Sequence, residues 1–420
     1  MERYKMRIGK KYSFSIKVKH ARKGIFFTNF IFLLTSLLNT HFAYSTALTI
    51  SFEDVAQKVS KQNYAVRENA IQVYQTKESI QVARGSLLPK LNFWKIAAVS
   101  LEPVMALGMV DDVAPFLFPS RWIQVEEQKV LYLASQESYR ALWANEVMTA
   151  KALYLNALLD ISILEHIEEN KRQFETILKI AKDREQLGGI KPGSAREVEI
   201  QILALEEDKR ALSVLIAQEL NSLSYILGLP SEIELTLAPV DLSDFETFEP
   251  LTYSDFEFRV LDSSPELRQL EHMIDAADLL KKEVTFDFWG LGTPASIRIA
   301  KAQKEALKIQ RESTREKIKR ELKFLVDHYN LDLRNYANAK RRSQLTQISL
   351  NQQFERLRLG GTIEINDLIE SSRNHIQADT DFFRISYEFL RSEDKLARLI
   401  FHGDYDKKPA TLVHLGEKRR

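Results

Sequence analysis

The sequence predicts a mainly α-helical fold built from long antiparallel helical hairpins, as in an α-helical barrel or coiled coil. Gly (14) and Pro (11) are scarce among 420 residues, while 28% of residues are charged and 45% are hydrophobic. That composition is typical of long amphipathic helices. Glycine pairs end two long apolar-periodic runs, at Gly188-Gly189 and at Gly360-Gly361. Since glycine adopts the left-handed C-cap conformation without strain, each pair indicates a turn between two helices.

Charge and cysteine content exclude several classes of function. The formal net charge is +1, so the chain as a whole has no field that would attract nucleic acid. There is no cysteine, which excludes disulfides, thiolate catalysis, cysteine-based zinc sites and N-terminal lipoprotein acylation.

Residues 1–45 are predicted to be a secretory signal peptide. A long basic region (3–23) precedes an apolar core (24–38), and Ala43 and Ser45 supply small residues for a cut before Thr46. An uncleaved inner-membrane anchor is the alternative. The apolar run is short for a spanning helix, which favours export.

The first predicted repeat covers 46–230. A helix starts at the N-cap Ser51, carries apolar residues at three-, four- and seven-residue intervals, and ends before Pro89. Segment 89–119 is rich in proline and aromatics and is predicted to hold one or two strands. A long hairpin (121–228) follows, whose first helix of about 65 residues would span about 100 Å and must therefore belong to a bundle or tube.

An acidic linker (231–250) with a short strand at Glu234–Leu237 leads to the second predicted repeat, 251–403. This repeat contains a helix, a short β segment (284–292), and a second long hairpin (294–402) in which Pro294 takes the first helical position. Residues 404–420 are predicted to be a basic tail.

The two halves share sequence features as well as element order. Asn63-Tyr64 and Ser264-Pro265 both predict a kink inside a helix, about 201 residues apart. Around the second pair of turns the offset falls to about 170, so roughly thirty residues are missing from the second half. Most of that loss must lie in 284–292, and the second β-hairpin is therefore predicted to be truncated.

Several short motifs occur in an order similar to that of a known family. They are Ser51–Ala56 with Asn63, Gly85–Leu91, Leu227–Pro230, Ser264–Leu267, and Arg356–Gly361 with Asp367-Leu368. This order resembles the TolC family of outer-membrane efflux proteins (outer membrane factors). The resemblance implies two tandem halves, and a homotrimer that forms a β-barrel in the outer membrane and an α-helical tunnel in the periplasm.

The resemblance also implies partners and site residues. A periplasmic adaptor (membrane fusion protein), which connects the channel to an inner-membrane pump, would dock at the helical turns. The implied docking residues are Leu187, Gly188, Gly189, Leu359, Gly360, Gly361 and Asp367. The alternative is that the glycines are helix caps and nothing more. No cofactor is implied.

One departure from the family pattern concerns the barrel. A membrane-crossing strand needs about 9–11 residues, so the segment Lys282–Thr293 is too short for a barrel hairpin. A trimer would then contribute about six strands, whereas the family has twelve.

Three further residues are candidates for the lining of a tunnel. Asp160, Lys340 and Gln347 interrupt apolar runs and could face a tunnel lumen, although a solvated helix face is the favoured interpretation of all three. The eight histidines include no His-x-x-x-His pair and the carboxylates no cluster with ligand spacing, so no metal site is predicted. No nucleophile–base or paired-acid arrangement stands out, and no enzyme activity is expected.

The leading hypothesis is the channel-forming subunit of a tripartite efflux or type I secretion system that exports small molecules or peptides. A periplasmic helical scaffold derived from such channels is the alternative suggested by the short second β segment. An inner-membrane-anchored coiled-coil protein is a third hypothesis, based on the N-terminal apolar run.

Overall fold

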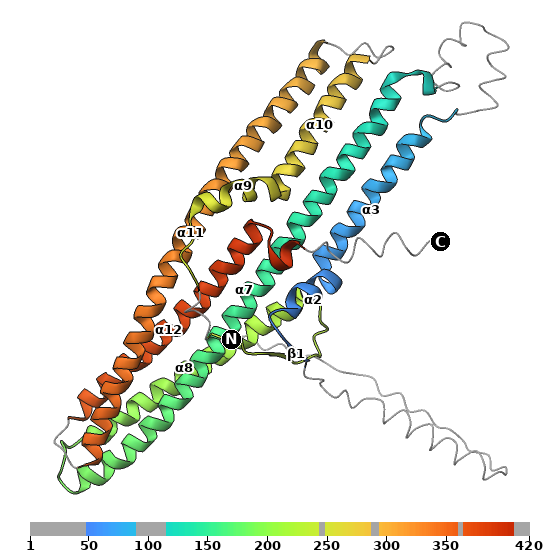
Figure 1. The fold of residues 1–420 in the computed structure, drawn as a ribbon. Coiled ribbons are helices and arrows are strands. Elements are labelled where there is room, and N and C mark those ends of the chain that lie inside the picture. Colours follow the sequence, from blue (N-terminus) through green and yellow to red (C-terminus); the bar gives the residue numbers. More distant parts are fainter. Residues whose placement is uncertain (1–47, 90–114, 243–247, 287–293, 360–363, 407–420) are drawn as a thin grey trace, which may run out of the picture. The chain divides into compact units, whose positions relative to one another are not determined.

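The computed structural model describes residues 48–89, 115–242, 248–286, 294–359 and 364–406, and its helices follow an order that occurs twice (Figure 1). The first half contains α2 (Asp54–Gln62), α3 (Tyr64–Gly85), η1 (Pro115–Leu117), α7 (Pro119–Gln186) and α8 (Ser194–Ile226). The second contains α9 (Tyr253–Ser263), α10 (Pro265–Phe286), α11 (Pro294–Arg358), α12 (Ile365–Leu399) and η3 (Gly403–Asp406). Two short strands are β1 (Leu48–Ile50) and β2 (Leu235–Leu237). The mainly α-helical fold is confirmed.

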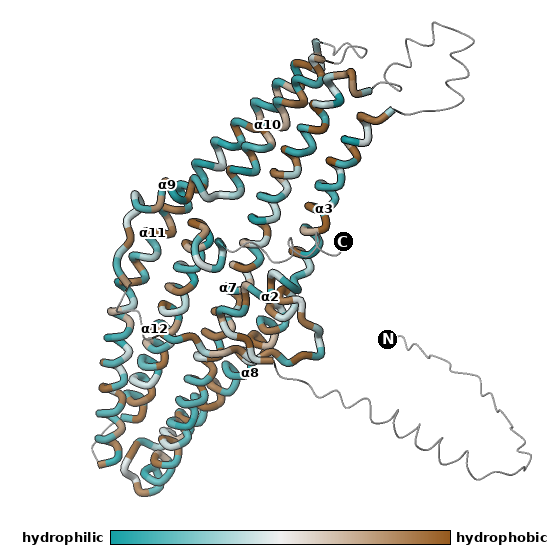
Figure 2. Tube along the Cα trace, turned by 45° about the vertical axis from the view of Figure 1, so that its right-hand side comes forward, coloured by the Kyte–Doolittle hydropathy of each residue, from teal (hydrophilic) through white to brown (hydrophobic). Residues whose placement is uncertain are grey.

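The two longest helices organise the rest. α7 has 68 residues and α11 has 65, so each is about 100 Å long at 1.5 Å per residue. α7 packs against α3 and α8, and α11 packs against α10 and α12, the same pairing in each half. α7 also packs against α10 and α12, which joins the halves. Figure 2 shows hydrophobic residues spread along these helices in short bands separated by hydrophilic ones, as expected for helices that bury one stripe each.

Large aromatic residues of α7 hold the middle of the chain together. Tyr139, Trp143 and Tyr154 are fully or almost fully buried in one apolar cluster with residues of α2, α3 and α8. The Trp143 indole donates a hydrogen bond of 2.7 Å to the Ser60 hydroxyl of α2, so its polar end is satisfied in the interior.

The predicted kinks lie between α2 and α3 and between α9 and α10. The Asn63 side chain accepts a hydrogen bond from Val66 N (2.9 Å) and thereby caps α3. Its amide nitrogen donates to Glu146 of α7 (3.0 Å) and to the carbonyl of Ile226 in α8 (2.8 Å). Asn63 therefore fixes the kink to both arms of the first hairpin.

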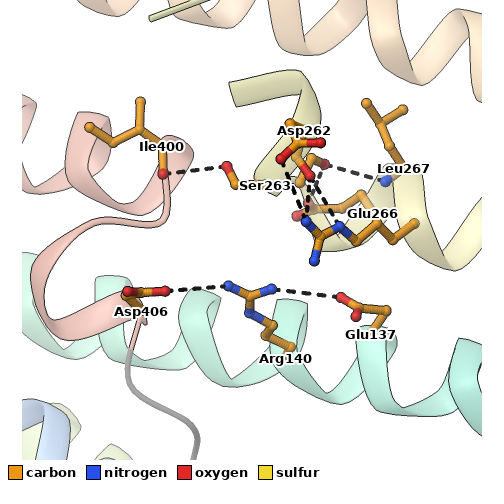
Figure 3. Close-up of polar contacts among 10 residues, drawn as sticks. Glu137, Arg140, Asp262, Ser263, Glu266, Leu267, Ile400 and Asp406 are labelled. Atoms are coloured by element: carbon orange, nitrogen blue, oxygen red, sulfur yellow. Dashed lines mark hydrogen bonds and ion pairs between the residues drawn. The ribbon is translucent and has the colours of Figure 1, made fainter. Parts of the chain in front are cut away.

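Ser264 has the same role in the second half, where its hydroxyl accepts from Leu267 N at 3.3 Å. Figure 3 shows the surroundings of this kink, with Ser263 donating to the carbonyl of Ile400 just beyond α12 (3.3 Å). In the same view, Arg140 of α7 lies 4.0 Å from both Glu137 and Asp406.

The two strands form a parallel pair in the register Leu48–Leu235, Thr49–Thr236 and Ile50–Leu237. The Tyr154 hydroxyl lies 2.6 Å from the carbonyl oxygen of Ala238 and 3.0 Å from that of Ile50, which ties the pair to α7. The predicted strand at Glu234–Leu237 is thus confirmed, whereas its partner β1 was not predicted. Residues 234–238 are thus held against the first half, and this part of the predicted linker belongs to the packed structure.

Two predicted β segments need correction where the structure describes them. Val284–Phe286 continue α10, and the Thr285 hydroxyl donates to the Lys281 carbonyl within that helix. Adding a residue to an existing helix costs little, so helix extension outweighs the β preference of Val284 and Phe286. Residues Pro115–Leu117 form a 3₁₀ turn and Pro119 already opens α7. Residues 90–114 and 287–292 lie outside the described ranges, as do the signal peptide (1–45), Gly360 and Gly361.

The predicted basic tail (404–420) also needs correction at its first residues. Gly403–Asp406 form η3, in which Tyr405 is buried and its hydroxyl donates to Asp394 (2.6 Å). Asp404 lies 2.9 Å from the ammonium group of Lys151, which is buried in α7 and also contacts Asp394 at 3.0 Å. Because a buried ammonium needs carboxylate partners, residues 404–406 belong to the packed structure.

Candidate functional site

The turn after α7 has the geometry of a Schellman motif. Gly188 adopts a left-handed φ of 73°, its N–H donates to the Glu185 carbonyl (3.2 Å), and the Gly189 N–H donates to the Arg184 carbonyl (2.8 Å). This pair of hydrogen bonds is typical of a helix that ends with glycine at the C′ position. Leu187, at the end of the helix, is 84% exposed. The turn therefore presents the apolar side chain of Leu187 beside two glycines, which have no side chain.

Glu185 connects this turn to the next helix. Its carboxylate accepts from Gly193 N at 2.7 Å and from Ala195 N at 3.1 Å, at the start of α8. These backbone hydrogen bonds, that from Gly193 foremost, hold the pKa of Glu185 below its usual value. A carboxylate at a helix N-terminus also interacts favourably with the helix dipole, so the loop geometry is fixed at both ends.

The second turn is described in part. Leu359 directly follows α11 and is 79% exposed, like Leu187 in the first turn. Asp367 lies in the first turn of α12 and is exposed, while its neighbour Leu368 is fully buried. Gly360 and Gly361 fall in a stretch for which the structure gives no placement.

The two turns lie at the same end of the helices (Figure 1). An apolar cluster joins them, which includes Phe174 and Ile177 from α7, Val198 from α8, Leu357 from α11 and Leu368 from α12. The Arg184 guanidinium donates to the Leu357 carbonyl at 2.5 Å, so the end of α7 is bonded to the end of α11. The predicted docking residues that the structure describes are thus brought together on one surface, which we call the tip.

Asp160 of α7 lies close to Glu219 of α8, and the two carboxyl groups influence each other's pKa. Burial and the neighbouring Asp160 carboxylate raise the pKa of Glu219 to about 7. Burial likewise raises the pKa of Asp160. Asp160 therefore has an acidic neighbour on the next helix, and its lumen-facing position stays a prediction.

Lys340 and Gln347 are on α11 in different surroundings. The Lys340 ammonium lies 5.8 Å from the centroid of the Tyr336 ring, and the residue is half-buried. Gln347 is exposed, one turn before the buried Leu350. Gln347 is exposed, as either a lumen-facing or a solvated position requires. Lys340 is only partly exposed.

One group of residues was missed by the sequence analysis. His166 of α7 lies beside His375 and Asp379 of α12, with the nearest ligand atoms of all three within 4.8 Å of one another. Burial, opposed by Asp379, lowers the pKa of His166. The four-residue spacing of His375 and Asp379 was a usable signal, but a mixed pair is neither a histidine pair nor a carboxylate cluster. The third member comes from a helix about 200 positions away, which no local pattern reveals.

Among the described residues one helix, α7, is long and apolar enough to cross a membrane, over an 18-residue window. The core helix of a helical bundle has the same property. Since α7 packs against α3, α8, α10 and α12, we interpret it as a core helix.

Comparisons with known proteins give matches in structure and not in sequence. No family model matches the chain, and no curated protein does. The outer membrane channel CmeC of Campylobacter jejuni is similar in structure, with a TM-score of 0.70 and 13% identity over 87% of this chain and 88% of that one. The open-state outer membrane channel MtrE of Neisseria gonorrhoeae has a TM-score of 0.66 and 13% identity over 84% and 89%.

A membrane protein of Pseudomonas aeruginosa is also similar, with a TM-score of 0.68 and 14% identity over 86% of this chain and 92% of that one. At such identities the likeness concerns the fold. The resemblance to the TolC family is confirmed at that level.

Proposed function

We propose that this chain, which has the outer membrane factor fold, is the channel-forming subunit of a tripartite efflux or type I secretion system. In this function three copies line an α-helical tunnel and export small molecules or peptides, without enzymatic chemistry. The observation that carries the proposal is the fold itself. Two matched hairpins on helices of 68 and 65 residues share their arrangement with outer membrane channels over most of both chains.

Association of several copies, which a trimer requires, is supported by apolar side chains that a single chain leaves exposed. On α8 they include Leu203 (60% exposed) and Val214 (70%), and on α11 they include Phe324 (64%) and Ile348 (50%). Burying such residues against neighbouring copies removes apolar area from water, the main driving force for association. Most of the chain would then lie in the periplasm and the 89–119 segment in the outer membrane.

The tip is the proposed docking surface for a periplasmic adaptor, which would link the channel to an inner-membrane pump. Leu187 and Leu359 are exposed there in equivalent positions of the two hairpins. Exposed apolar side chains next to side-chain-free glycines allow another helix to approach the backbone closely. Asp367 supplies a charge on the same surface.

The periplasmic scaffold remains a second proposal, favoured by one observation. α10 ends at Phe286 and α11 begins at Pro294, so the connection contains seven residues. Two membrane-crossing strands would need about 18–22 residues. A chain descended from such channels could retain the helical arms without completing a barrel.

Cell fractionation with the untagged protein separates these functions. Recovery in the detergent-extracted outer membrane, as a species with the mass of three chains, is the result expected for the channel. Soluble periplasmic recovery would favour the scaffold instead. Recovery in the inner membrane with residues 1–45 intact would contradict both and favour an anchored coiled coil.

A further inference from the structure

We propose that His166, His375 and Asp379 form a binding site for a divalent transition metal, Zn²⁺ or a similar ion, which fastens α7 to α12. Two imidazole nitrogens and one carboxylate oxygen are a ligand set that Zn²⁺ uses in proteins, with the fourth position open to water. The three residues come from both halves of the chain, so a bound ion would cross-link the two hairpins. Such a site is independent of the channel function proposed above.

The distances suit a tetrahedral ion. His166 Nε2 lies 3.3 Å from Asp379 Oδ2, and His375 Nε2 lies 3.5 Å from the same oxygen. For metal–ligand bonds of about 2.0–2.1 Å, ligand atoms of a tetrahedral site are separated by about 3.3 Å. The remaining separation, between the two imidazole nitrogens, is within 4.8 Å, and a small rotation of either ring shortens it.

Residues of a third helix hold two of the ligands in place. Ser343 of α11 donates a hydrogen bond of 2.5 Å to Asp379 Oδ1, which leaves Oδ2 facing the histidines. Thr346 Oγ1, also on α11, lies 3.4 Å from His375 Nδ1. When Nδ1–H donates to that hydroxyl, the Nε2 lone pair is directed toward Asp379 Oδ2 and His166. Metal-binding histidines and carboxylates characteristically have such outer partners.

Burial makes the arrangement costly without an ion. The side chains of His166, His375 and Asp379 are 12%, 7% and 15% exposed. Among the described residues, His166 Nε2 is buried without a hydrogen bond, although it lies 3.3 Å from a carboxylate oxygen of Asp379. One turn toward the tip, Asn170 Oδ1 and Ser372 Oγ are also buried without partners in the described structure. Buried polar atoms without partners are rare in proteins, and a cation between His166 and Asp379 would satisfy the first of these.

The test uses the purified full-length protein, stripped of metal with a chelator and carrying no histidine tag. We expect calorimetric titration with Zn²⁺ to give one ion per chain. Titration with Co²⁺ should give the intense visible absorption of a tetrahedral site. The variants His166→Gln, His375→Gln and Asp379→Asn should each weaken Zn²⁺ binding more than about 100-fold, while Ser343→Ala, which alters an outer partner, should weaken it about 10–100-fold.

His328→Ala is the matched control. His328 Nε2 lies 3.7 Å from Asp332 Oδ2 with the same four-residue spacing on α11, but in the described structure no third ligand joins that pair. Zn²⁺ should also raise the melting temperature of the wild type and of His328→Ala, and not that of His375→Gln. If folded wild-type protein takes up no stoichiometric Zn²⁺, or if the ligand variants bind it as tightly as His328→Ala, the site does not exist. If a ligand variant loses its helical circular dichroism, the Zn²⁺ affinity of Ser343→Ala is the test of the site instead.

Discussion

Gly228 occupies a position where a side chain has no room. Its φ is 67°, and a Cβ there would lie 2.2 Å from the carbonyl oxygen of Gln62, at the end of α2. Backbone atoms cannot move aside as a flexible side chain can. The turn after α8 therefore requires glycine, because it lies directly against the kink at Asn63.

We expect Gly228→Ala to destabilise the protein by about 3 kcal/mol or more, from the steric clash together with the left-handed backbone. Thermal unfolding followed by circular dichroism measures the loss. Gly85→Ala is the control, since a Cβ there meets nothing within 4 Å at the end of α3. That change should be neutral or stabilise by up to about 1 kcal/mol. Equal melting temperatures for the two variants would show that the close approach is absent.

The Asp160–Glu219 pair predicts a pH dependence of stability. The pKa of Glu219 is raised to about 7 in the folded protein from an ordinary value of 4.5, so the folded state binds more protons between these values. The stabilisation that protonated Glu219 contributes is therefore fully present below pH 4.5, and it is lost as the pH rises through about 7. Glu219→Gln should raise the melting temperature relative to wild type at pH 8 and much less at pH 4. A difference that is the same at both pH values would contradict the raised pKa of Glu219.

At the residue scale, features determined by neighbours along the chain could be predicted. The glycine at the end of α7 and the kink residues Asn63 and Ser264 are examples, since capping depends on three or four adjacent residues. The partner of Asp160 and the grouping of His166 with His375 could not be predicted. Both depend on which faces of separate helices meet.

The tip offers a direct test of docking at the scale of the hairpin. At Gly188 any side chain would be strained by the left-handed φ of 73°. At Gly189 a Cβ would make an ordinary contact of 3.6 Å with the Arg184 carbonyl oxygen. Gly189→Leu therefore adds bulk to the turn at little cost to the fold.

We expect Gly189→Leu to leave an intact oligomer that no longer crosslinks to its adaptor and no longer supports export. Lys179→Leu, at an exposed position two turns earlier on α7, is the control and should retain both. Crosslinking in cells followed by export assays measures the effect. If the Gly189→Leu oligomer still crosslinks and exports normally, the turn glycines are helix caps only.

Helices were more predictable than the small elements between them. The long helices follow from apolar periodicity and from proline and glycine at their ends, which are local signals. β1 and η3 have three and four residues, and neither would be stable alone. β1 exists because β2 pairs with it, and η3 exists because Lys151 needs Asp404.

At the scale of the whole molecule, the signal peptide is a prediction about export. The basic, apolar and small-residue pattern of residues 1–45 predicts a mature chain that starts near Thr46. N-terminal sequencing of protein purified from its native membrane measures this directly. A sequence that begins at Met1 would instead support an uncleaved anchor.

The duplicated architecture was predictable because the motifs recur in order, and the confirmed fold extends that prediction to the whole helical part. The homotrimer is expected only from the family resemblance, since exposed residues such as Val214 and Phe324 indicate a contact surface but not the number of copies.

Conductance of the purified trimer in a planar lipid bilayer tests the channel function most directly. A trimer that completes its membrane part and lines a tunnel should produce discrete, long-lived current steps from single insertions. Heat-unfolded protein at the same concentration should produce none. A folded trimer that inserts no conducting unit would contradict the channel and leave the periplasmic scaffold as the function of this fold.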